Sequence, residues 1–254
     1  MSVQIPKIIF IVPYRDRQEH LDEFKKHMKT VMEDYATEDY KYMFIHQCDT
    51  RRFNRGAMKN IGFIAASRLY PDHYLDITFV FNDVDSMPVK KNILDYQTTP
   101  NVIKHFYGFK FALGGMVSIL GRDFARIGGF PNFWGWGYED NMLQMRAINA
   151  NITIDRSVFF PINDSENIIQ LTHGNAREMN RHDFNQFKNK TKEGIFTIYL
   201  LNYTIDDAND FINVSDFKTS YEENKVATFV YDLNNGNSPL KKTRGNPTMV
   251  MNFL

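Results

Sequence analysis

Two carboxylates stand one residue apart in the segment Asp83-Val84-Asp85, which follows the apolar run 77–81 after a single asparagine, Asn82. If the chain turns at the end of a buried strand, both side chains can reach one divalent cation. Mg²⁺ and Mn²⁺ favour oxygen ligands together with substrate phosphates, and such a cation neutralises charge on a departing nucleoside diphosphate. An Asx-turn after a strand gives the same pattern, so the segment gains its meaning from the rest of the chain.

The segment 134–140 reads Trp-Gly-Trp-Gly-Tyr-Glu-Asp. Three aromatic residues that alternate with glycines suit neither a strand nor a helix. Glycine freedom combined with large flat side chains suits a mobile lid that stacks on a sugar. Glu139 and Asp140 are expected at a helix N-terminus, where the helix dipole favours an ionised carboxylate. The alternative is a pair of acids that only caps the helix, and we interpret the segment as functional.

Four other residues could bind a ligand or a metal ion, but each could also have a purely structural role. Arg15 and Arg17 follow Pro13, where guanidinium groups can meet phosphate or remain solvated at a helix start. Phe53 can stack on a base, or it can be an aromatic staple before a helix cap. A lone histidine such as His173 is more often structural than a metal ligand.

The elements that position these residues alternate between strand and helix. Apolar runs indicate strands, and apolar residues at helical spacing among charges indicate amphipathic helices. This alternation is typical of a parallel sheet with right-handed crossovers, whose ligands bind beyond the carboxyl ends of the strands. Pro13 and Asp83 fall at such ends. Strands are predicted at 8–12, 42–45, 77–81, 196–205 and 227–233, and helices at 17–33, 54–71 and 140–150.

Composition narrows the function classes. The 254 residues, 43% of them hydrophobic, suit one domain over 1–233 with a polar tail at 234–254. Thirty basic residues balance thirty acidic ones, so we expect no nucleic-acid partner. Cys48 stands alone, and no signal peptide or run of about 18 apolar residues is found. The expectation is a cytoplasmic protein without a transmembrane segment.

The motifs follow an order that resembles the β-1,4-galactosyltransferase family over about residues 7–205. The family includes N-acetylgalactosaminyltransferases and a xylose-specific galactosyltransferase. The resemblance implies an α/β fold, a GT-A-type Rossmann-like domain with a mostly parallel central sheet flanked by helices. It also implies a UDP-sugar donor, Mn²⁺ or alternatively Mg²⁺, and inversion at the anomeric carbon by a single displacement. The matching segments are 12–21, 53–56, 60–63, 83–85, 114–115, 129–132 and 134–140.

The resemblance also implies roles for single residues. Asp140 is the implied general base that deprotonates the acceptor hydroxyl, and Asp85 and His173 are the implied metal ligands. The implied acceptor-binding residues are Tyr138, Glu139 and Asn141. The implied donor-binding residues are Pro13, Tyr14, Arg15, Arg17, Phe53, Asp83, Val84, Ala112, Gly115 and Trp136.

The chain departs from the family pattern at four positions. Tyr138 stands where the family commonly has Gly or Arg, and Asn141 stands where it has a third acid. Gln170 falls near the place of a second metal ligand, where it offers an amide oxygen or leaves the place to water. Ala112 replaces a tyrosine that limits the space beside the donor's C2 group. UDP-GalNAc and UDP-GlcNAc therefore become candidate donors alongside UDP-galactose.

The sequence predicts a metal-dependent inverting glycosyltransferase that moves a hexose or N-acetylhexosamine from a UDP-sugar to an acceptor hydroxyl of a glycan. One alternative is a catalytically inactive carbohydrate-binding or nucleotide-sugar-binding module of the same fold, which Tyr138, Asn141 and the missing second ligand favour. Another is a metal-dependent nucleotidyltransferase. That class has no use for an aromatic lid, and the chain has no obvious glycine loop for phosphate.

Overall fold

The computed structural model describes residues 4–172 and 174–235 of the chain. His173 therefore lies outside the described residues, as does nearly all of the predicted tail at 234–254.

The core of the fold is a nine-stranded sheet in the order β11-β12-β2-β1-β3-β6-β5-β7, with β8 also paired to β5. Five of its strand pairs are parallel and three are antiparallel. The sheet is thus mixed, with parallel pairs in the majority. Its strands are β1 (Ile8–Tyr14), β2 (Tyr40–Gln47), β3 (Thr78–Asn82), β5 (Val102–Gly108), β6 (Met116–Leu120), β7 (Thr153–Asp155), β8 (Phe160–Pro161), β11 (Tyr199–Asp206) and β12 (Phe211–Lys218).

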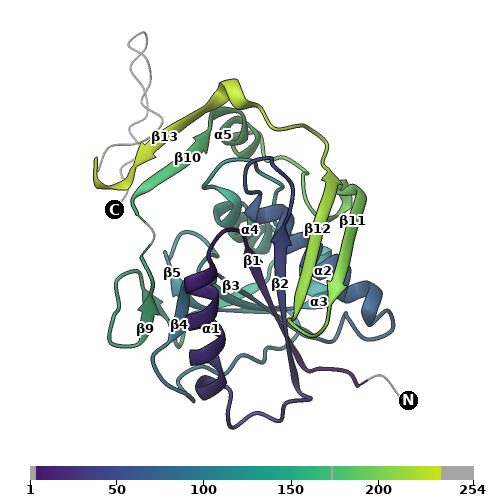
Figure 1. Cartoon of the computed structure of the whole chain (residues 1–254), viewed down its shortest axis with the longest axis vertical. Helices are drawn as coiled ribbons and strands as arrows, with labels where there is room; N and C mark the ends of the chain where they lie inside the picture. The colour runs from purple at the N-terminus through teal and green to yellow at the C-terminus, as the bar shows by residue number, and fades with distance from the viewer. Residues whose placement is uncertain (1–3, 173, 236–254) are drawn as a thin grey trace.

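Helices cover both faces of this sheet, and two short ladders lie beside it (Figure 1). The ladders are β4 (Ser86–Pro88) with β9 (Ile168–Gln170), and β10 (Ala176–Asn180) with β13 (Thr228–Asp232). The α-helices are α1 (Gln18–Val31), α2 (Arg55–Leu69), α3 (Gly121–Arg126), α4 (Glu139–Asn149) and α5 (Arg181–Lys188). Short 3-10 helices occupy Ile195–Thr197, Lys225–Ala227 and Leu233–Asn235.

β1 is buried along its whole length because each face of the sheet packs on a helical layer. Its alternate side chains point to opposite faces, so Ile9 and Ile11 join the core with α2, α3 and α4, whereas Phe10 joins the core with α1. In Figure 1, α1 lies in front of the sheet and the other three lie behind it. α2 approaches closely because Gly62 has no side chain: a methyl group there would lie 2.7 Å from Ile11 Cγ2.

The elements predicted before residue 100 are confirmed, with one correction at Pro13. The strand predicted to stop there runs on to Tyr14, with Pro13 in register with Ile45. Pairing of β1 with β3 ends at Ile11, so the last residues have a ladder partner on one side only, and a proline is tolerated there. The late strand predicted to begin at 196 is also corrected, because residues Ile195–Thr197 form a 3-10 turn.

Candidate active site

The turn that carries the Asp-x-Asp motif is built by the last residue of β3. Asn82 Nδ2 donates hydrogen bonds to the carbonyl oxygens of Asp83 at 2.7 Å and Ser86 at 2.8 Å. The Asp83 N–H donates to Gly115 O at 3.1 Å. Gly115 has a φ of +71°, which glycine adopts without strain. The motif is thus fixed at the carboxyl end of β3, next to the end of β1.

Five charged side chains meet beside this turn, and we call them the charged cluster: Arg55, Lys59, Asp83, Glu139 and Asp140. Arg55 Nη2 lies 2.8 Å from Asp83 Oδ2, and its Nη1 lies 3.5 Å from Glu139 Oε1. Lys59 Nζ lies 3.2 Å from Asp140 Oδ1 and 3.7 Å from Asp83 Oδ1. Two cations one turn apart on α2 therefore join the acid after β3 to both acids that begin α4.

Burial dominates the electrostatics of the cluster. It raises the pKa of Glu139, and the neighbouring Asp140 raises it further, while Arg55 and Lys59 act in the opposite direction. Burial alone would lower the pKa of Arg55, but Asp83 and Glu139 outweigh it and raise that pKa above its usual value. Glu139 Oε2 is buried without a hydrogen-bond partner among the described groups. The cluster thus places a buried carboxyl beside a partly exposed one.

Asp140 is held against the 109–115 loop by contacts on both backbone and side chain. Its carbonyl oxygen accepts from Leu113 N at 3.1 Å, and the adjacent Asn141 Nδ2 donates to Phe111 O at 3.1 Å. Gly114 leaves just enough room, since a methyl group there would lie 2.2 Å from Asp140 Oδ2. The sequence-predicted base and the glycine pair are therefore neighbours in space.

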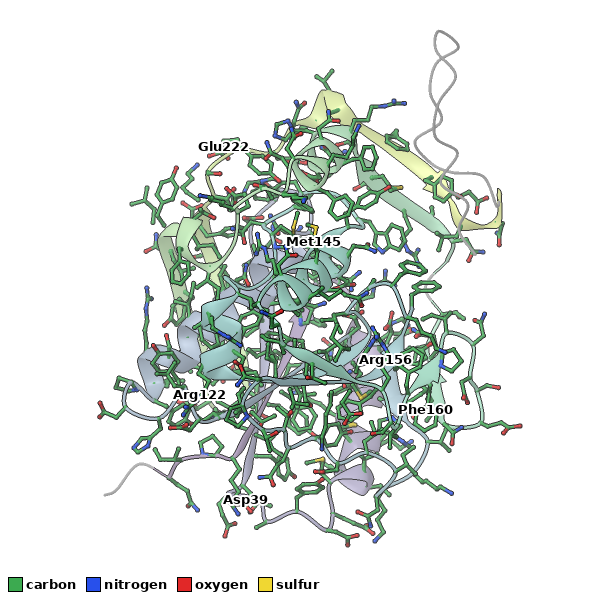
Figure 2. The ribbon with its side chains drawn as sticks, turned by 180° about the vertical axis from the view of Figure 1, so that it is seen from behind. Asp39, Arg122, Met145, Arg156, Phe160 and Glu222 are labelled. Carbon is green, nitrogen blue, oxygen red and sulfur yellow. The ribbon has the colours of Figure 1, made fainter. Side chains whose placement is uncertain are left out.

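Arg156 fastens the same loop to α4, and Figure 2 shows it below Met145 of that helix. Its Nη2 donates to Lys110 O and to Gln144 Oε1, both at 2.8 Å, and its Nε donates to His105 Nδ1 at 3.0 Å. Burial, reinforced by Arg156, lowers the pKa of His105 to about 4. His105 is therefore neutral at pH 7, accepting at Nδ1 and donating from Nε2 toward the carbonyls of the loop.

The tryptophan-glycine segment is packed more firmly than a lid. Trp134 is 1% exposed and its ring stacks on Phe217 with centroids 5.5 Å apart, so the interpretation of this residue as part of a mobile lid is wrong. Trp136 is half-buried. Its backbone N–H donates to Glu178 O at 2.6 Å, and the Arg177 guanidinium lies over its ring, 5.7 Å from the ring centroid. Of the two tryptophans, Trp136 is the one that retains access to a substrate.

Tyr138 turns away from the segment toward α5. Its ring packs on Phe184 and Phe187, with centroids 5.0 and 5.1 Å away. It precedes α4 with a φ of +71°, a conformation that favours glycine. The contact with α5 stabilises an arrangement that the tyrosine alone disfavours.

The predicted donor-binding residues near β1 have structural contacts of their own. The Arg15 guanidinium donates to Gln47 O at 3.2 Å, to Arg51 O at 2.5 Å and to both backbone and side chain of Asp49. It therefore fixes the loop between β2 and α2. Phe53, at the end of this loop, is half-buried and packs against the core beneath α2.

The other predicted donor-binding positions surround the ends of β1 and β3. Tyr14 is buried, and its hydroxyl donates to Gln18 Oε1 at 3.3 Å. Arg17 is the N-cap residue of α1 and is half-buried. Val84, in the turn after β3, and Ala112, in the 109–115 loop, are buried at 8% and 7% exposure.

The contacts around Asp85 show which side chains are available to a divalent cation. Its backbone carbonyl accepts from Leu171 N at 2.8 Å, which brings the segment before His173 alongside it. Gln170 is engaged elsewhere, since its Oε1 accepts from Ser86 Oγ at 3.0 Å and from Tyr107 Oη at 2.8 Å. Within 4–172 and 174–235, no group of three His, Cys, Asp or Glu forms a ligand set. The Asp85 carboxylate is an oxygen ligand of the kind that Mn²⁺ favours.

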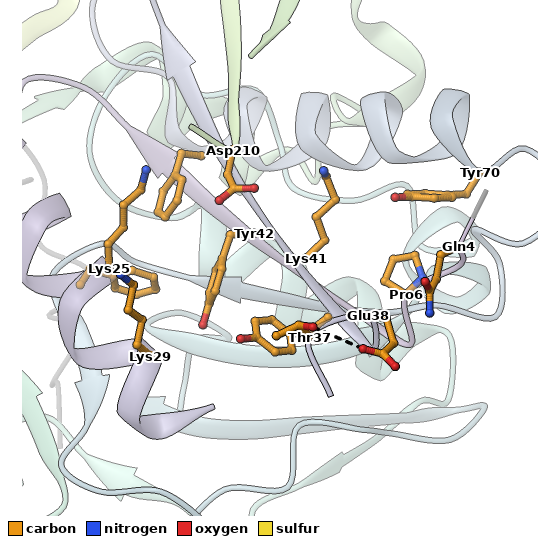
Figure 3. Close-up of a pocket in the computed structure, with 13 residues that line it drawn as sticks. Gln4, Pro6, Lys25, Lys29, Thr37, Glu38, Lys41, Tyr42, Tyr70 and Asp210 are labelled. Carbon is orange, nitrogen blue, oxygen red and sulfur yellow. Dashed lines mark hydrogen bonds between the residues drawn. The ribbon is translucent and has the colours of Figure 1, made fainter. Parts of the chain in front are cut away.

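A groove on the described part of the molecule lies away from this chemistry. It has a volume of about 520 Å³ and runs between α1 and the first half of β2, with Lys25, Lys41, Tyr42 and Asp210 on its walls (Figure 3). None of the sequence-predicted site residues lines it. The titratable groups converge instead at the charged cluster.

Sequence reasoning missed both cations of the cluster. Arg55 was considered only as part of a motif that stacks on a base, and Lys59 was not considered. The signal was present: Lys59 interrupts the apolar stretch that α2 buries, and a lysine is rarely fully buried unless it is paired.

Two family models match the chain. The N-terminal region of glycosyl transferase group 7 matches residues 3–97, and the N-terminal domain of galactosyltransferase matches residues 101–173. Together they cover β1 to β9, which includes the whole charged cluster.

Curated relatives carry galactosyltransferase names. Xylosylprotein 4-beta-galactosyltransferase of Caenorhabditis elegans is 31% identical over 79% of this chain and 72% of the relative. Mouse beta-1,4-galactosyltransferase 6 is 30% identical over 68% of this chain, and mouse beta-1,4-galactosyltransferase 1 is 32% identical over 59%. The matches span 45% and 39% of these two mouse proteins.

A solved structure shares the fold. The catalytic domain of Drosophila beta1,4-galactosyltransferase 7, in complex with xylobiose, superposes with a TM-score of 0.62 at 20% identity, over 86% of this chain and 96% of that one. A mutant of the same enzyme in complex with manganese, UDP-Gal and xylobiose gives the same score. The GT-A expectation for the fold is confirmed.

The comparisons also correct the expected location. Relatives of this kind are Golgi galactosyltransferases that normally face the lumen, so the cytoplasmic assignment is wrong. Among the helices of the described residues, none is long and apolar enough to cross a membrane. On motif order, fold and these relatives, the chain belongs to the β-1,4-galactosyltransferase family of glycosyltransferases.

Proposed function

We propose that this chain transfers a hexose or N-acetylhexosamine from a UDP-sugar to an acceptor hydroxyl with inversion, and that the charged cluster is its active site. The observation that carries the proposal is the convergence of Asp83 and Asp140 on one ammonium group, that of Lys59. A donor-contacting acid and a general base must lie on either side of the same sugar, and these two acids approach from β3 and α4.

Mn²⁺ is the proposed metal, held by Asp85 and His173. The complex of the similar Drosophila enzyme with manganese and UDP-Gal supports this choice. When bound, the ion supplies a Lewis acid that stabilises the diphosphate as it leaves. Gln170 is not among the proposed ligands, because its amide oxygen accepts two hydrogen bonds from hydroxyl groups.

The proposed chemistry is a single displacement. Asp140 accepts the proton of the acceptor hydroxyl as that oxygen forms a bond to the anomeric carbon. The bond from the anomeric carbon to the diphosphate oxygen breaks, and its electron pair leaves with UDP. Asp140 suits the role of base because its side chain is 18% exposed, whereas Glu139 beside it is 4% exposed and has its pKa raised by burial. Glu139 is proposed to contact the acceptor.

The donor and acceptor are proposed by class. A UDP-sugar is expected at Tyr14, Arg17 and Phe53, beside the turn after β3. The acceptor is proposed to be a sugar hydroxyl of a glycan, which the xylobiose complex of the Drosophila enzyme and the xylosylprotein specificity of the nematode relative both support.

The rival proposal is a binding module that kept the pocket and lost turnover. It is favoured by Tyr138, whose ring is engaged by α5, and by Asn141 in place of an acid. The paired arrangement of Asp83, Lys59 and Asp140 opposes it, because binding alone gives no reason to direct two acids at one buried ammonium group.

A panel of UDP-sugars tests the proposal. UDP release and glycosylated product are measured with and without Mn²⁺ for the wild type and for Asp140→Asn. We expect Mn²⁺-dependent transfer from at least one donor, and we expect the Asn variant to lose transfer while it still binds UDP. Metal-dependent UDP binding without turnover of any donor would establish the binding module instead. Transfer that survives in the Asn variant would place the base elsewhere.

A further inference from the structure

Lys59 is a lysine in the interior of the protein. Its side chain is 2% exposed, and α2 carries it between β3 and α4. Burying an ammonium group is costly unless it is paired. Here it faces Asp140 at 3.2 Å and Asp83 at 3.7 Å, and it lies 4.6 Å from the centroid of the Phe130 ring.

The contacts differ in what they do for each acid. Asp83 already has a cation at 2.8 Å, the guanidinium of Arg55, whose other nitrogen faces Glu139. For Asp83 the nearest cation is therefore Arg55, whereas Lys59 is the cation that pairs with Asp140. Gly114 closes the opposite side of that carboxylate, since a methyl group there would lie 2.2 Å from Oδ2.

Asp140 is thus fixed between an ammonium group on Oδ1 and a glycine backbone beside Oδ2. A general base must lie within hydrogen-bond reach of the proton that it accepts, and an error of about 1 Å in position is costly to the rate. An ion pair to one oxygen sets the direction of the other.

We propose that Lys59 is a positioning residue for sugar transfer. Its ammonium group holds Asp140 Oδ1, which fixes the orientation of the carboxylate and keeps the base at a fixed distance from Asp83. This inference rests on the proposed function, because it assigns Asp140 the role of base. It concerns a residue that acts through Asp140 and touches neither substrate.

Two variants of similar length separate positioning from structural support. Lys59→Gln keeps an N–H donor for Asp140 without the charge, and Lys59→Met removes both. The turnover number kcat, the donor and acceptor KM, Mn²⁺-dependent UDP affinity and the melting temperature are measured for each. Lys41→Met is the matched control, because its ammonium pairs at the surface with Asp207.

The positioning role predicts an order of kcat. Wild type exceeds Lys59→Gln by about fivefold or more, and Lys59→Gln exceeds Lys59→Met. Donor KM and UDP affinity stay within about twofold, and Lys41→Met is unchanged. If Lys59→Met does not fold, the comparison of kcat between the wild type and Lys59→Gln tests the same prediction.

Two results overturn the inference. One is a kcat in Lys59→Gln equal to that of the wild type. The other is a loss of UDP affinity and melting temperature that parallels the loss of kcat, which is the signature of structural support alone. A wild type that transfers no sugar to any acceptor overturns the proposed function itself, and that result is recognised before any variant is made.

Discussion

The guanidinium of Arg55 lies 2.8 Å from the carboxylate of Asp83, and this ion pair joins the first residue of α2 to the turn after β3. Its second nitrogen faces Glu139, which is buried at the start of α4. One side chain therefore connects three elements at the carboxyl edge of the sheet. The relationship makes Arg55 a structural member of the site.

Replacing Arg55 by Met is expected to destabilise the fold by about 3 kcal/mol, because breaking a buried pair leaves uncompensated carboxylates. Arg122→Met is the control: its ion pair with Asp76 is exposed at the surface and outside the cluster, and we expect at most about 1 kcal/mol there. Urea unfolding at pH 7 measures both. Equal losses in the two variants would contradict the special role of Arg55.

Gly114→Ala is expected to impair transfer while leaving the fold nearly intact. The new methyl group would lie 2.2 Å from Asp140 Oδ2 and 2.7 Å from its Cγ, so the carboxylate must leave the position in which it pairs with Lys59. The displaced atoms belong to a side chain, so the structure can adapt cheaply. We expect kcat to fall about 100-fold with a small change in melting temperature. Unchanged kcat would show that this position of Asp140 is not needed.

Much of the first half of the fold could be predicted from local pattern. The strands 8–12 and 77–81 are apolar runs, and Asn54 caps α2 through a hydrogen bond from Ala57 N at 2.8 Å, as its position suggested. The order of motifs fixed the family. These features depend on residues that are close in the sequence, so a short stretch of sequence is enough to predict them.

The rest depends on partners that are distant in the chain. Lys59 is buried because Asp140, 81 residues later, pairs with it. Trp134 enters the core because Phe217 offers it a ring to stack on, and the glycines around it indicate nothing of that contact. β12 joins the sheet beside β2 although more than 160 residues separate them. No local periodicity encodes such pairings.

Ala112→Tyr is expected to narrow the range of donors. Ala112 is 7% exposed in the loop beside Asp140 and Gly115, and a large side chain there would take space at the proposed donor site. We expect transfer from UDP-GalNAc or UDP-GlcNAc to fall at least tenfold relative to UDP-galactose. Competition assays with paired donors measure the ratio, and Ala112→Gly should leave it unchanged. The idea fails if the ratio does not move, or if the wild type uses UDP-galactose alone.

Gln170→Ala is expected to lower Mn²⁺ affinity by no more than about tenfold, because the Gln170 amide oxygen accepts from Ser86 and Tyr107, and Ser86 in turn donates to Asp85 Oδ1. Asp85→Ala should abolish metal-dependent UDP binding. Calorimetric titration of Mn²⁺ in the presence of UDP compares the two. A drop of well over tenfold in Gln170→Ala would restore the amide as a ligand.

Asp183 gives the fold a distinctive dependence on pH. Its Oδ2 accepts from Gly135 N at 2.6 Å and its Oδ1 from Tyr221 Oη at 2.8 Å, yet burial raises its pKa from 3.8 to about 7. Between these two values the folded state binds a proton that the unfolded chain has lost. Stability from this group is therefore fully present below about pH 4 and is lost as pH rises to about 7.

The loss is on the order of 4 kcal/mol, the equivalent of about three pKa units. Asp183→Asn keeps an oxygen for the Gly135 N–H and cannot ionise, so it should not share this loss. Urea unfolding of both proteins at pH 5 and pH 8 captures about two of these three units, or roughly 3 kcal/mol, and titrations common to both cancel in the difference. We expect Asp183→Asn to gain stability relative to the wild type on going to pH 8. Parallel pH profiles would mean that Asp183 is already ionised in the fold, held so by Gly135 and Tyr221 against the effect of burial.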